Sequence, residues 1–471
     1  MPWAAPSRWT AQNTPDDADV LLNPPPDDLT DGWTPTGHVV DMVDHISGPA
    51  EDAQTSPASY QPEFEDPDVE AERILAVEAI VRNTMGPPEP SAAEIRRMQD
   101  RANAWHECPY TPERLAHINE LTTRFYEARL PDSWAQPYLT ERLRQDITGH
   151  PDIRPGYAPD TWTSLVQHLH RQGVTDDEML SAGVAKVAST GRLIDRFRDR
   201  VVFPIAHRGQ VLGFVARRNP AHSDEDKRGP KYLNTPETPL FHKGDQLYVI
   251  PSARNSEPVL VEGPLDAIAV TLAAGPSHYG MASLGTSLTL TQVAQLGRLS
   301  TTVTVATDAD AAGRKAAERD FWLLAAMGVD PRCAHLPENS DPADLVLHQG
   351  ADRLAEALRS AGSLGVRIFD EYSGSCHDPA VILHCARLIA ALPPEEWRDR
   401  ISDLASRNQL PVGLVKVALA SMVRAWNTDP VKAAEQSALG TRTQPKADAL
   451  RIAAKERAPA TTYLRSRGVN R

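Results

Sequence analysis

Between residues 258 and 336, strand patterns alternate with helix patterns, which leaves few folds open to this part of the chain. Short apolar runs typical of strands occur at 259–261, 279–283, 302–307 and 333–336. Helical patterns separate them at 265–274, 290–299 and 311–327. Strands joined by helices of this length run parallel, with the helices on the faces of the sheet. The sequence therefore predicts a doubly wound α/β sheet within a domain at 257–350.

The segments on either side carry other patterns. Residues 105–256 are expected to form a mixed helical and β subdomain. Thr111 is placed to cap a helix that begins at Pro112, and strand patterns at 200–205 and 211–216 flank a turn at Arg208-Gly209, as in a hairpin. After the sheet, residues 351–426 have a helical pattern throughout, and residues 427–471 are expected to be a polar tail.

The acidity of the chain is concentrated at its N-terminus. Residues 1–100 carry 20 Asp and Glu against 5 Arg, a charge of −15, whereas the whole chain carries −14. The remainder is therefore close to neutral, so the total charge does not exclude a nucleic-acid partner. Residues 1–104 are also rich in Pro, Ser and Thr, and we expect them to be mostly disordered, with a short helix at 69–83.

Other sequence features exclude several protein classes. The chain contains no apolar stretch of 18 residues and no signal-peptide pattern, so we expect a cytoplasmic protein without a membrane partner. Its 4 cysteines are too few for a disulfide framework. The pairs Cys376-His377 and His384-Cys385 fit no zinc-site spacing, and we expect ordinary buried or surface residues there.

Carboxylates follow three of the predicted strands. Glu262 comes directly after the first, Asp308 and Asp310 follow the third, and Asp341 and Asp344 follow the last. A single Asp-x-Asp after a strand more often caps a helix or lies in a solvated turn. Because the carboxyl ends of parallel strands meet at one edge, however, all five acids together predict a site for Mg²⁺ or Mn²⁺, which prefer oxygen ligands.

A basic stretch precedes these acids. Residues 191–243 contain 11 Arg and Lys against 6 Asp and Glu, a charge of +5. Within it, Arg196, Arg198 and Arg200 alternate with other residues, which fits either contact with a phosphate backbone or the solvated face of an edge strand. Three aromatic residues (Tyr232, Phe241 and Tyr248) could stack on bases, but we expect two of the three to pack in the core.

Several longer motifs resemble a known family. The sequences VEGPLD (261–266), ASLGTS (282–287), DADAAGR (308–314) and DPAD (341–344) resemble the Toprim domain of primases, topoisomerases and some nucleases. The sequences GYAPDTW (156–162), LSAGVA (180–185), RFRDRVVFPI (196–205), KYLNTPET (231–238) and LFHKGDQLY (240–248) are similar to the catalytic core of bacterial DnaG-type DNA primases. The resemblance covers roughly residues 112–425.

This resemblance implies template-directed synthesis of short RNA primers from ribonucleoside triphosphates on single-stranded DNA. It implies catalysis and metal binding by Glu262, Asp308 and Asp310, with Asp341 as a further ligand. Where the family has a second acid, this chain has Ala343, so the role of Asp344 stays open. Nucleotide and template contacts are implied for the cleft-facing basic subdomain, at Arg198, Arg200, Lys231, Asn234 and Lys243.

Family members also carry an N-terminal zinc ribbon and a helicase-binding domain, and we expect neither here. No Cys/His quartet of the required kind occurs, so no zinc is expected, and only about 45 residues follow Trp426. A replicative helicase or another replication protein is the implied protein partner, on a chromosome or a mobile element. The alternatives are another Toprim enzyme, such as a nuclease, and a non-catalytic protein that binds single-stranded DNA.

Overall fold

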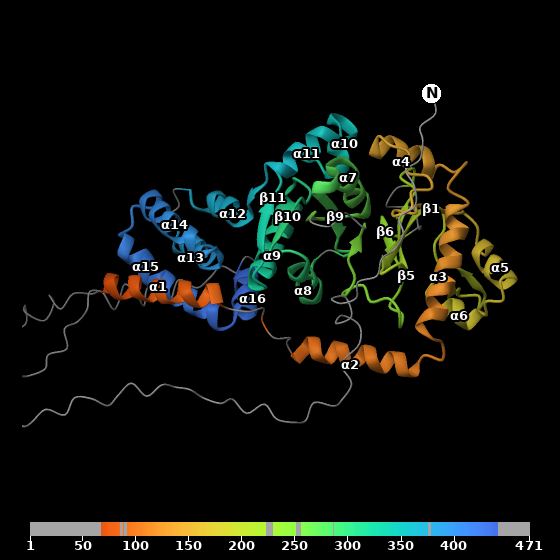
Figure 1. Cartoon of the computed structure of the whole chain (residues 1–471), viewed down its shortest axis with the longest axis horizontal. Helices are drawn as coiled ribbons and strands as arrows, with labels where there is room; N and C mark the ends of the chain where they lie inside the picture. The colour runs from red at the N-terminus through yellow and green to blue at the C-terminus, as the bar shows by residue number, and fades with distance from the viewer. Residues whose placement is uncertain are drawn as a thin grey trace, which may run out of the picture. The chain divides into compact units, whose positions relative to one another are not determined.

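The computed structural model describes residues 67–84, 88, 92–222, 229–250, 256–285, 287–374 and 378–440 (Figure 1). The chain divides into two compact units, Met1–Glu63 and Phe64–Arg471, and all described residues belong to the second. Within the described residues, no helix is long and apolar enough to cross a lipid bilayer.

The helices before the central sheet are α1 (Pro67–Thr84), α2 (Ala92–Glu107), α3 (Pro112–Glu127), α4 (Ala135–Leu143), α5 (Ser164–Arg171) and α6 (Asp176–Ser181). Those within and after it are α7 (Pro264–Ala274), α8 (Leu290–Leu299), α9 (Ala311–Ala326), α10 (Pro342–Gln349), α11 (Ala351–Arg359), α12 (Leu364–Tyr372), α13 (Pro379–Ala391), α14 (Pro394–Arg407), α15 (Val412–Thr428) and α16 (Pro430–Gly440). The strands are β1 (Gly156–Ala158), β2 (Ala185–Val187), β3 (Leu193–Asp195), β4 (Arg200–His207), β5 (Gln210–Arg218), β6 (Tyr232–Asn234), β7 (Tyr248–Val249), β8 (Glu257–Val261), β9 (His278–Ala282), β10 (Thr302–Val305), β11 (Asp330–Cys333) and β12 (Gly362–Ser363).

The parallel sheet that the alternating patterns predicted is present, and it forms the centre of a six-stranded sheet of order β12-β11-β10-β8-β9-β7. Its four central strands pair in parallel, and the short edge strands β12 and β7 pair antiparallel. The predicted bounds of α8 agree with the structure. β11 begins three residues earlier than predicted, because its ladder with β10 pairs Thr302 with Asp330, and a proline at the start of a strand hides the pattern.

The two faces of this sheet are covered by different helices, as Figure 1 shows. Alternate strand residues divide between them, since successive side chains in a strand point to opposite faces. Leu260 and Val303 pack in one core cluster with side chains of α8 and α9. Val259 and Val261 pack in another, with side chains of α7, α10 and α11. The sheet is therefore buried on both faces, and its carboxyl edge remains for function.

The subdomain before this sheet contains the predicted hairpin. β4 and β5 pair around Arg208-Gly209 in a four-stranded antiparallel sheet of order β1-β4-β5-β6. Helix α3 packs against β1 and β5, and Thr111 caps it by accepting a hydrogen bond from the backbone N–H of Arg114, as predicted. A separate two-stranded sheet joins β2 and β3.

The expectation for both ends of the chain needs correction. We assigned residues 1–104 to a mostly disordered segment with a short helix at 69–83. Helix α1 agrees with that helix, whereas α2 was not predicted and runs to Glu107, past the end of the segment. The prediction for residues 1–66 lies outside the described residues. At the other end, α16 lies in the segment assigned to a polar tail after 426 and packs against α9, with Ala434 fully buried. Average composition concealed the apolar faces of α1 and α16, which pack against α15 and α9.

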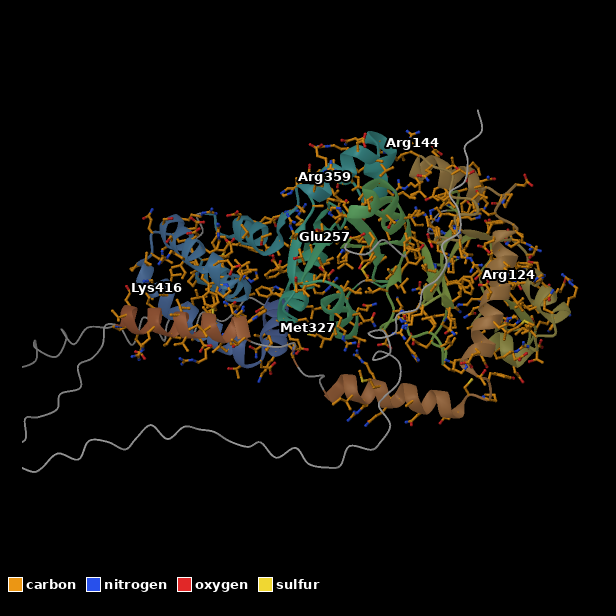
Figure 2. All side chains as sticks on the ribbon, viewed as in Figure 1. Arg124, Arg144, Glu257, Met327, Arg359 and Lys416 are labelled. Carbon is orange, nitrogen blue, oxygen red and sulfur yellow. The ribbon has the colours of Figure 1, made fainter. Side chains whose placement is uncertain are left out.

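Helix α1 is joined to α15 by polar and aromatic contacts. Arg82 donates to the side chain of Asn427 (2.5 Å) and to the carbonyl of Ala390 (2.8 Å), and its guanidinium lies over the rings of Trp397 and Trp426. Lys416, which Figure 2 labels on α15, pairs with acids of α1.

We expect Leu75→Ala to lower the free energy of unfolding by about 2 kcal/mol, because Leu75 is only 9 % exposed in the interface of α1 with the bundle. Val77→Ala on the same helix is the matched control, since Val77 is 54 % exposed and should change stability by less than about 0.5 kcal/mol. Urea unfolding of both variants measures the difference. Equal stabilities would show that α1 is not part of the folded unit.

Candidate active site

Three strands of the parallel sheet bring acidic residues to its carboxyl edge. Glu262 follows β8 directly, Asp308 lies in the turn after β10, and Asp341 precedes α10, which follows β11. Because β8, β10 and β11 are parallel neighbours, their carboxyl ends lie at the same edge. The structure therefore brings together the strand ends that the sequence predicted would carry the chemistry.

Glu262 and Asp308 are in direct contact. The backbone N–H of Asp308 donates to Oε1 of Glu262 at 3.3 Å. Burial, together with the negative charges of Glu262 and Asp341, raises the pKa of the Asp308 carboxyl from 3.8 to about 6, against the lowering effect of Lys231. The edge thus carries negative charge that its own cations do not fully compensate.

Two of the predicted acids also cap helices. Asp310 is the N-cap of α9 and accepts a hydrogen bond from the N–H of Gly313 at 2.7 Å. Asp341 is the N-cap of α10 and accepts one from the N–H of Asp344 at 2.6 Å. A capping role, which the sequence left open, is therefore real for both. It holds each carboxylate at a defined place at the positive end of a helix.

Asp266 is an acid of this site that the sequence reasoning did not single out. It lies in the first turn of α7, is 7 % exposed, and accepts a hydrogen bond from the N–H of Ala343 at 3.4 Å. Burial and the charges of Asp341 and Asp308 raise the pKa of this carboxyl well above its usual value, which favours its protonated form. The sequence signal that could have indicated Asp266 was its position four residues after Glu262, in the first turn of the helix that follows.

Asp344 does not take the place of the acid that the family has at the position of Ala343, because its side chain points to Arg142. Its carboxylate pairs with Nη1 of Arg142, while Nη2 of Arg142 contacts both carboxylate oxygens of Asp341 at 3.0 and 2.8 Å. Ala343, between them in the chain, is fully buried in the core under α10. No sequence pattern indicated Arg142, which comes from α4, about 200 residues earlier.

The site for Mg²⁺ or Mn²⁺ that these five acids predict therefore stays a prediction. Among the described residues, no three Asp, Glu, His or Cys side chains stand close enough together to form a complete ligand set. Asp310 is turned to its helix, and Asp341 and Asp344 are turned to Arg142. The donors still fit a hard divalent cation, because they are all oxygens and because Glu262 and Asp308 share an edge with excess negative charge.

Three predicted binding residues line the approach to this edge. Lys231 is exposed and lies close enough to Asp308 to lower the pKa of its carboxyl. The side-chain amide of Asn234 donates to the carbonyl of Leu284 at 2.8 Å. The side chain of Lys243, also exposed, passes over Gly285 of the same segment. Asn234 and Lys243 thus meet at the loop after β9, while Lys231 faces the acids.

Arg200 was predicted to face the cleft, but it is buried. It is 2 % exposed and donates to the backbone carbonyls of Ala216 (3.3 Å), Pro230 (2.9 Å) and Lys231 (3.4 Å). The alternation of partly exposed and buried residues holds for 196–199 but breaks at Asp199, whose φ is 49°, so Arg200 enters β4 with its side chain buried. Arg200 therefore supports the backbone that carries Lys231.

Arg198, by contrast, reaches the surface beside an aromatic ring. Its guanidinium lies 3.4 Å from the centre of the Trp162 ring, and Trp162 is 59 % exposed. An exposed tryptophan stacked with a cation is suited to a nucleic-acid base or backbone. Trp162 ends the motif GYAPDTW, but the sequence analysis assigned it no role.

The expectation for the three aromatic residues is confirmed. Phe241 and Tyr248 are buried in the core, at 0 % and 2 % exposure. Tyr232 is half-buried, and its hydroxyl accepts a hydrogen bond from Arg217 at 2.8 Å. The pair His384-Cys385 is buried in α13, where His384 lies 3.1 Å from Glu318, whereas Cys376-His377 lies outside the described residues.

Comparison with known proteins identifies both halves of this site. The profile of the DNA primase catalytic core, N-terminal domain, matches residues 125–254, and that of a Toprim-like domain matches residues 259–346. The DNA primase of Pseudomonas putida is 33 % identical over 315 residues, which are 64 % of this chain and 46 % of that protein. The chain thus spans less than half the length of this relative.

Solved structures agree with this assignment. A DNA primase domain from Pseudomonas aeruginosa has 31 % identity and a TM-score of 0.54, covering 65 % of this chain and 99 % of that one. A DnaG primase catalytic domain bound to ssDNA has 28 % identity and a TM-score of 0.52, covering 63 % of this chain and 96 % of that one. With nearly the whole of a primase domain matched, and the acids in place at the sheet edge, the chain belongs to the family of DnaG-type DNA primases.

Proposed function

We propose that this protein synthesises short RNA primers on a single-stranded DNA template, by divalent-metal-dependent nucleotidyl transfer from ribonucleoside triphosphates. The observation that carries the proposal is the contact of Glu262 with Asp308 at the sheet edge, beside the exposed Lys231. The primase domain bound to ssDNA, which has the same fold, supports the nature of the template.

In the proposed reaction, a 3′-hydroxyl attacks the α-phosphate of an incoming nucleotide and pyrophosphate leaves. Mg²⁺ or Mn²⁺ held by Glu262 and Asp308, with Asp310 beside them, would acidify the attacking hydroxyl and stabilise charge on the phosphate. Lys231 and Lys243 would hold the triphosphate or the template backbone next to these acids. Asp266, buried in the first turn of α7, accepts a hydrogen bond from the N–H of Ala343 and so would help to hold the start of α10, with Asp341, in place.

The deciding experiment incubates the purified protein with single-stranded template, NTPs and Mg²⁺ or Mn²⁺, and in parallel with supercoiled and linear DNA. Template-dependent RNA oligomers are the expected product. Cleavage or relaxation of DNA without synthesis would instead indicate another Toprim enzyme. Binding of single-stranded DNA without either reaction would indicate a non-catalytic protein.

We expect Lys231→Ala or Lys243→Ala to flatten the salt dependence of single-strand binding by about 0.7 log units per log unit of salt, if the residue contacts a template phosphate. Lys186→Ala is the control, because Lys186 is equally exposed but lies on the separate β2–β3 sheet. Fluorescence anisotropy across a salt series gives the slopes. Unchanged slopes for both variants would assign these lysines to the triphosphate or to solvent.

A further inference from the structure

The contact of Arg142 with the acidic edge joins the two matched domains. Arg142 lies in the last turn of α4, within residues 125–254, whereas Asp341 and Asp344 lie at the start of α10, within the Toprim-like domain. The three side chains are largely shielded, with 16 %, 18 % and 31 % of their surfaces exposed. Charge-assisted hydrogen bonds in such a setting are stronger than those of exposed ion pairs.

In this contact, both carboxylate oxygens of Asp341 face the guanidinium of Arg142. One nitrogen of Arg142 contacts both of its carboxylate oxygens, and the same carboxylate also caps α10. A guanidinium cannot be neutralised in a protein, so it cannot leave this carboxylate by losing a proton. A divalent ion that used Asp341 as a ligand would therefore have to displace Arg142 from it.

The surroundings of Arg142 restrict where it could go. Tyr138 lies one turn earlier on α4, and the guanidinium of Arg217, which is itself bonded to Tyr232, lies over the Tyr138 ring. Arg142 and Arg217 lie close enough to oppose each other electrostatically. A displaced Arg142 would find more favourable partners at an anion, such as the phosphates of a nucleotide, than at these neighbours.

We propose that Arg142 is an internal counter-cation that competes with divalent metal for Asp341, so that the protein without nucleotide offers only the Glu262–Asp308 end of the edge to an ion. Asp341 becomes a ligand when the nucleotide phosphates draw Arg142 away. This inference rests on the metal site of the proposed function. It makes Arg142 a positioning residue that links the arrival of nucleotide to the completion of the site.

The test is a titration of the full chain with Mn²⁺ alone, without nucleotide, in which free Mn²⁺ is measured by electron paramagnetic resonance. Removing the competitor in Arg142→Gln should tighten Mn²⁺ binding at least about tenfold, the effect of losing one charged contact of about 1.4 kcal/mol. Arg144→Gln is the matched control. Arg144, labelled in Figure 2 at the end of α4, donates to the carbonyl of Leu347, and its replacement should leave the affinity unchanged.

Arg142→Lys distinguishes direct competition for Asp341 from a general electrostatic repulsion between a positive side chain and the metal ion. A lysine keeps the charge but cannot reach both carboxylates through two nitrogens, so Mn²⁺ should still bind about threefold more tightly than to the unmodified protein. If Arg142→Lys matches the unmodified protein while Lys231→Gln tightens binding as much as Arg142→Gln, the effect is a field effect and the proposal is wrong. Unchanged or weaker binding in Arg142→Gln would also overturn it.

Asp308→Asn tests the underlying metal site separately in the same titration. Weaker Mn²⁺ binding in this variant supports the site, whatever the Arg142 variants show. If Asp308→Asn still binds Mn²⁺ while Arg142→Gln binds it more tightly, the ion lies at Asp341 and not at Asp308. That result would contradict the proposed metal site but not the competition between Arg142 and the ion.

Discussion

Asp308→Asn should reduce primer synthesis by about 100- to 1000-fold, and yet it should make the metal-free protein more stable above pH 6. The loss follows from removing a carboxylate at the sheet edge, beside Glu262, where charge on the reacting phosphate must be stabilised. Glu262→Gln should lower activity to a similar extent. Asp341→Asn should be milder, because Arg142 rather than a metal contacts this carboxylate in the structure.

The gain in stability follows from the pKa of the same carboxyl. The pKa of Asp308 is raised from 3.8 to about 6 in the folded protein. Below about pH 4 this carboxyl is protonated in both folded and unfolded chains, and its ionisation costs nothing. As the pH rises from about 4 to about 6, the unfolded chain loses this proton while the folded protein still holds it, so stability falls. Above pH 6 both states are ionised, and the folded state bears the constant cost of an ionised group that it disfavours. Asparagine removes this cost, which we put at about 1–2 kcal/mol after solvent screening.

Activity and thermal melting should be measured on the same preparations. Asp399→Asn, on an exposed position of α14, is the control and should change neither quantity. Near-normal synthesis by Asp308→Asn with Mg²⁺ would show that the proposed site is wrong. A melting temperature that is lower than normal at pH 8 would show that Asp308 stabilises the fold and would make the lost activity uninformative.

Gly313→Ala is expected to abolish most of the activity, because it would displace the backbone of the turn that carries Asp308. A Cβ atom at Gly313 would stand 2.0 Å from the carbonyl oxygen of Asp308 and 2.9 Å from its carbonyl carbon. Since backbone atoms cannot yield as a flexible side chain can, the turn that carries Asp308 must move. We expect at least about a 100-fold loss of synthesis and a destabilisation of about 1–3 kcal/mol.

The sign of the stability change makes this prediction specific. Gly313 lies in the first turn of α9, where alanine by its helix propensity alone would stabilise the protein by up to about 1 kcal/mol. Gly297→Ala in α8 is the matched control, because the nearest atom to its new Cβ is a side-chain methyl of Val329 at 3.4 Å. Gly297→Ala should be neutral or stabilising, with normal activity. A stabilised, active Gly313→Ala would mean that the turn has room that the structure does not show.

Much of the fold could be predicted because it depends on local patterns. The limits of α8, the cap at Thr111 and the hairpin at Arg208-Gly209 all follow from spacing and turn residues within about ten positions. The placement of Glu262 and Asp308 at one edge also followed from the sequence, since parallel strands joined by helices must end on the same side.

Other features depended on contacts between residues far apart in the chain. The direction of Arg200 was set by carbonyls of β5 and of the segment before β6, which alternation along β4 alone cannot report. Helix α1 is held by hydrogen bonds with the backbone of Ala390 and the side chain of Asn427, 308 to 349 positions away, and its own composition resembled that of an unfolded segment.

The same distinction applies to the site. The sequence by itself determined which acids lie at the sheet edge, because strand order and strand direction are written in short periodic patterns. Only the tertiary structure decided which of those acids are available, since Arg142 reaches Asp341 across 199 positions and Asp266 is enclosed by α10. Such pairings arise when separate elements pack together, and no periodicity within either element encodes the partner that it will meet.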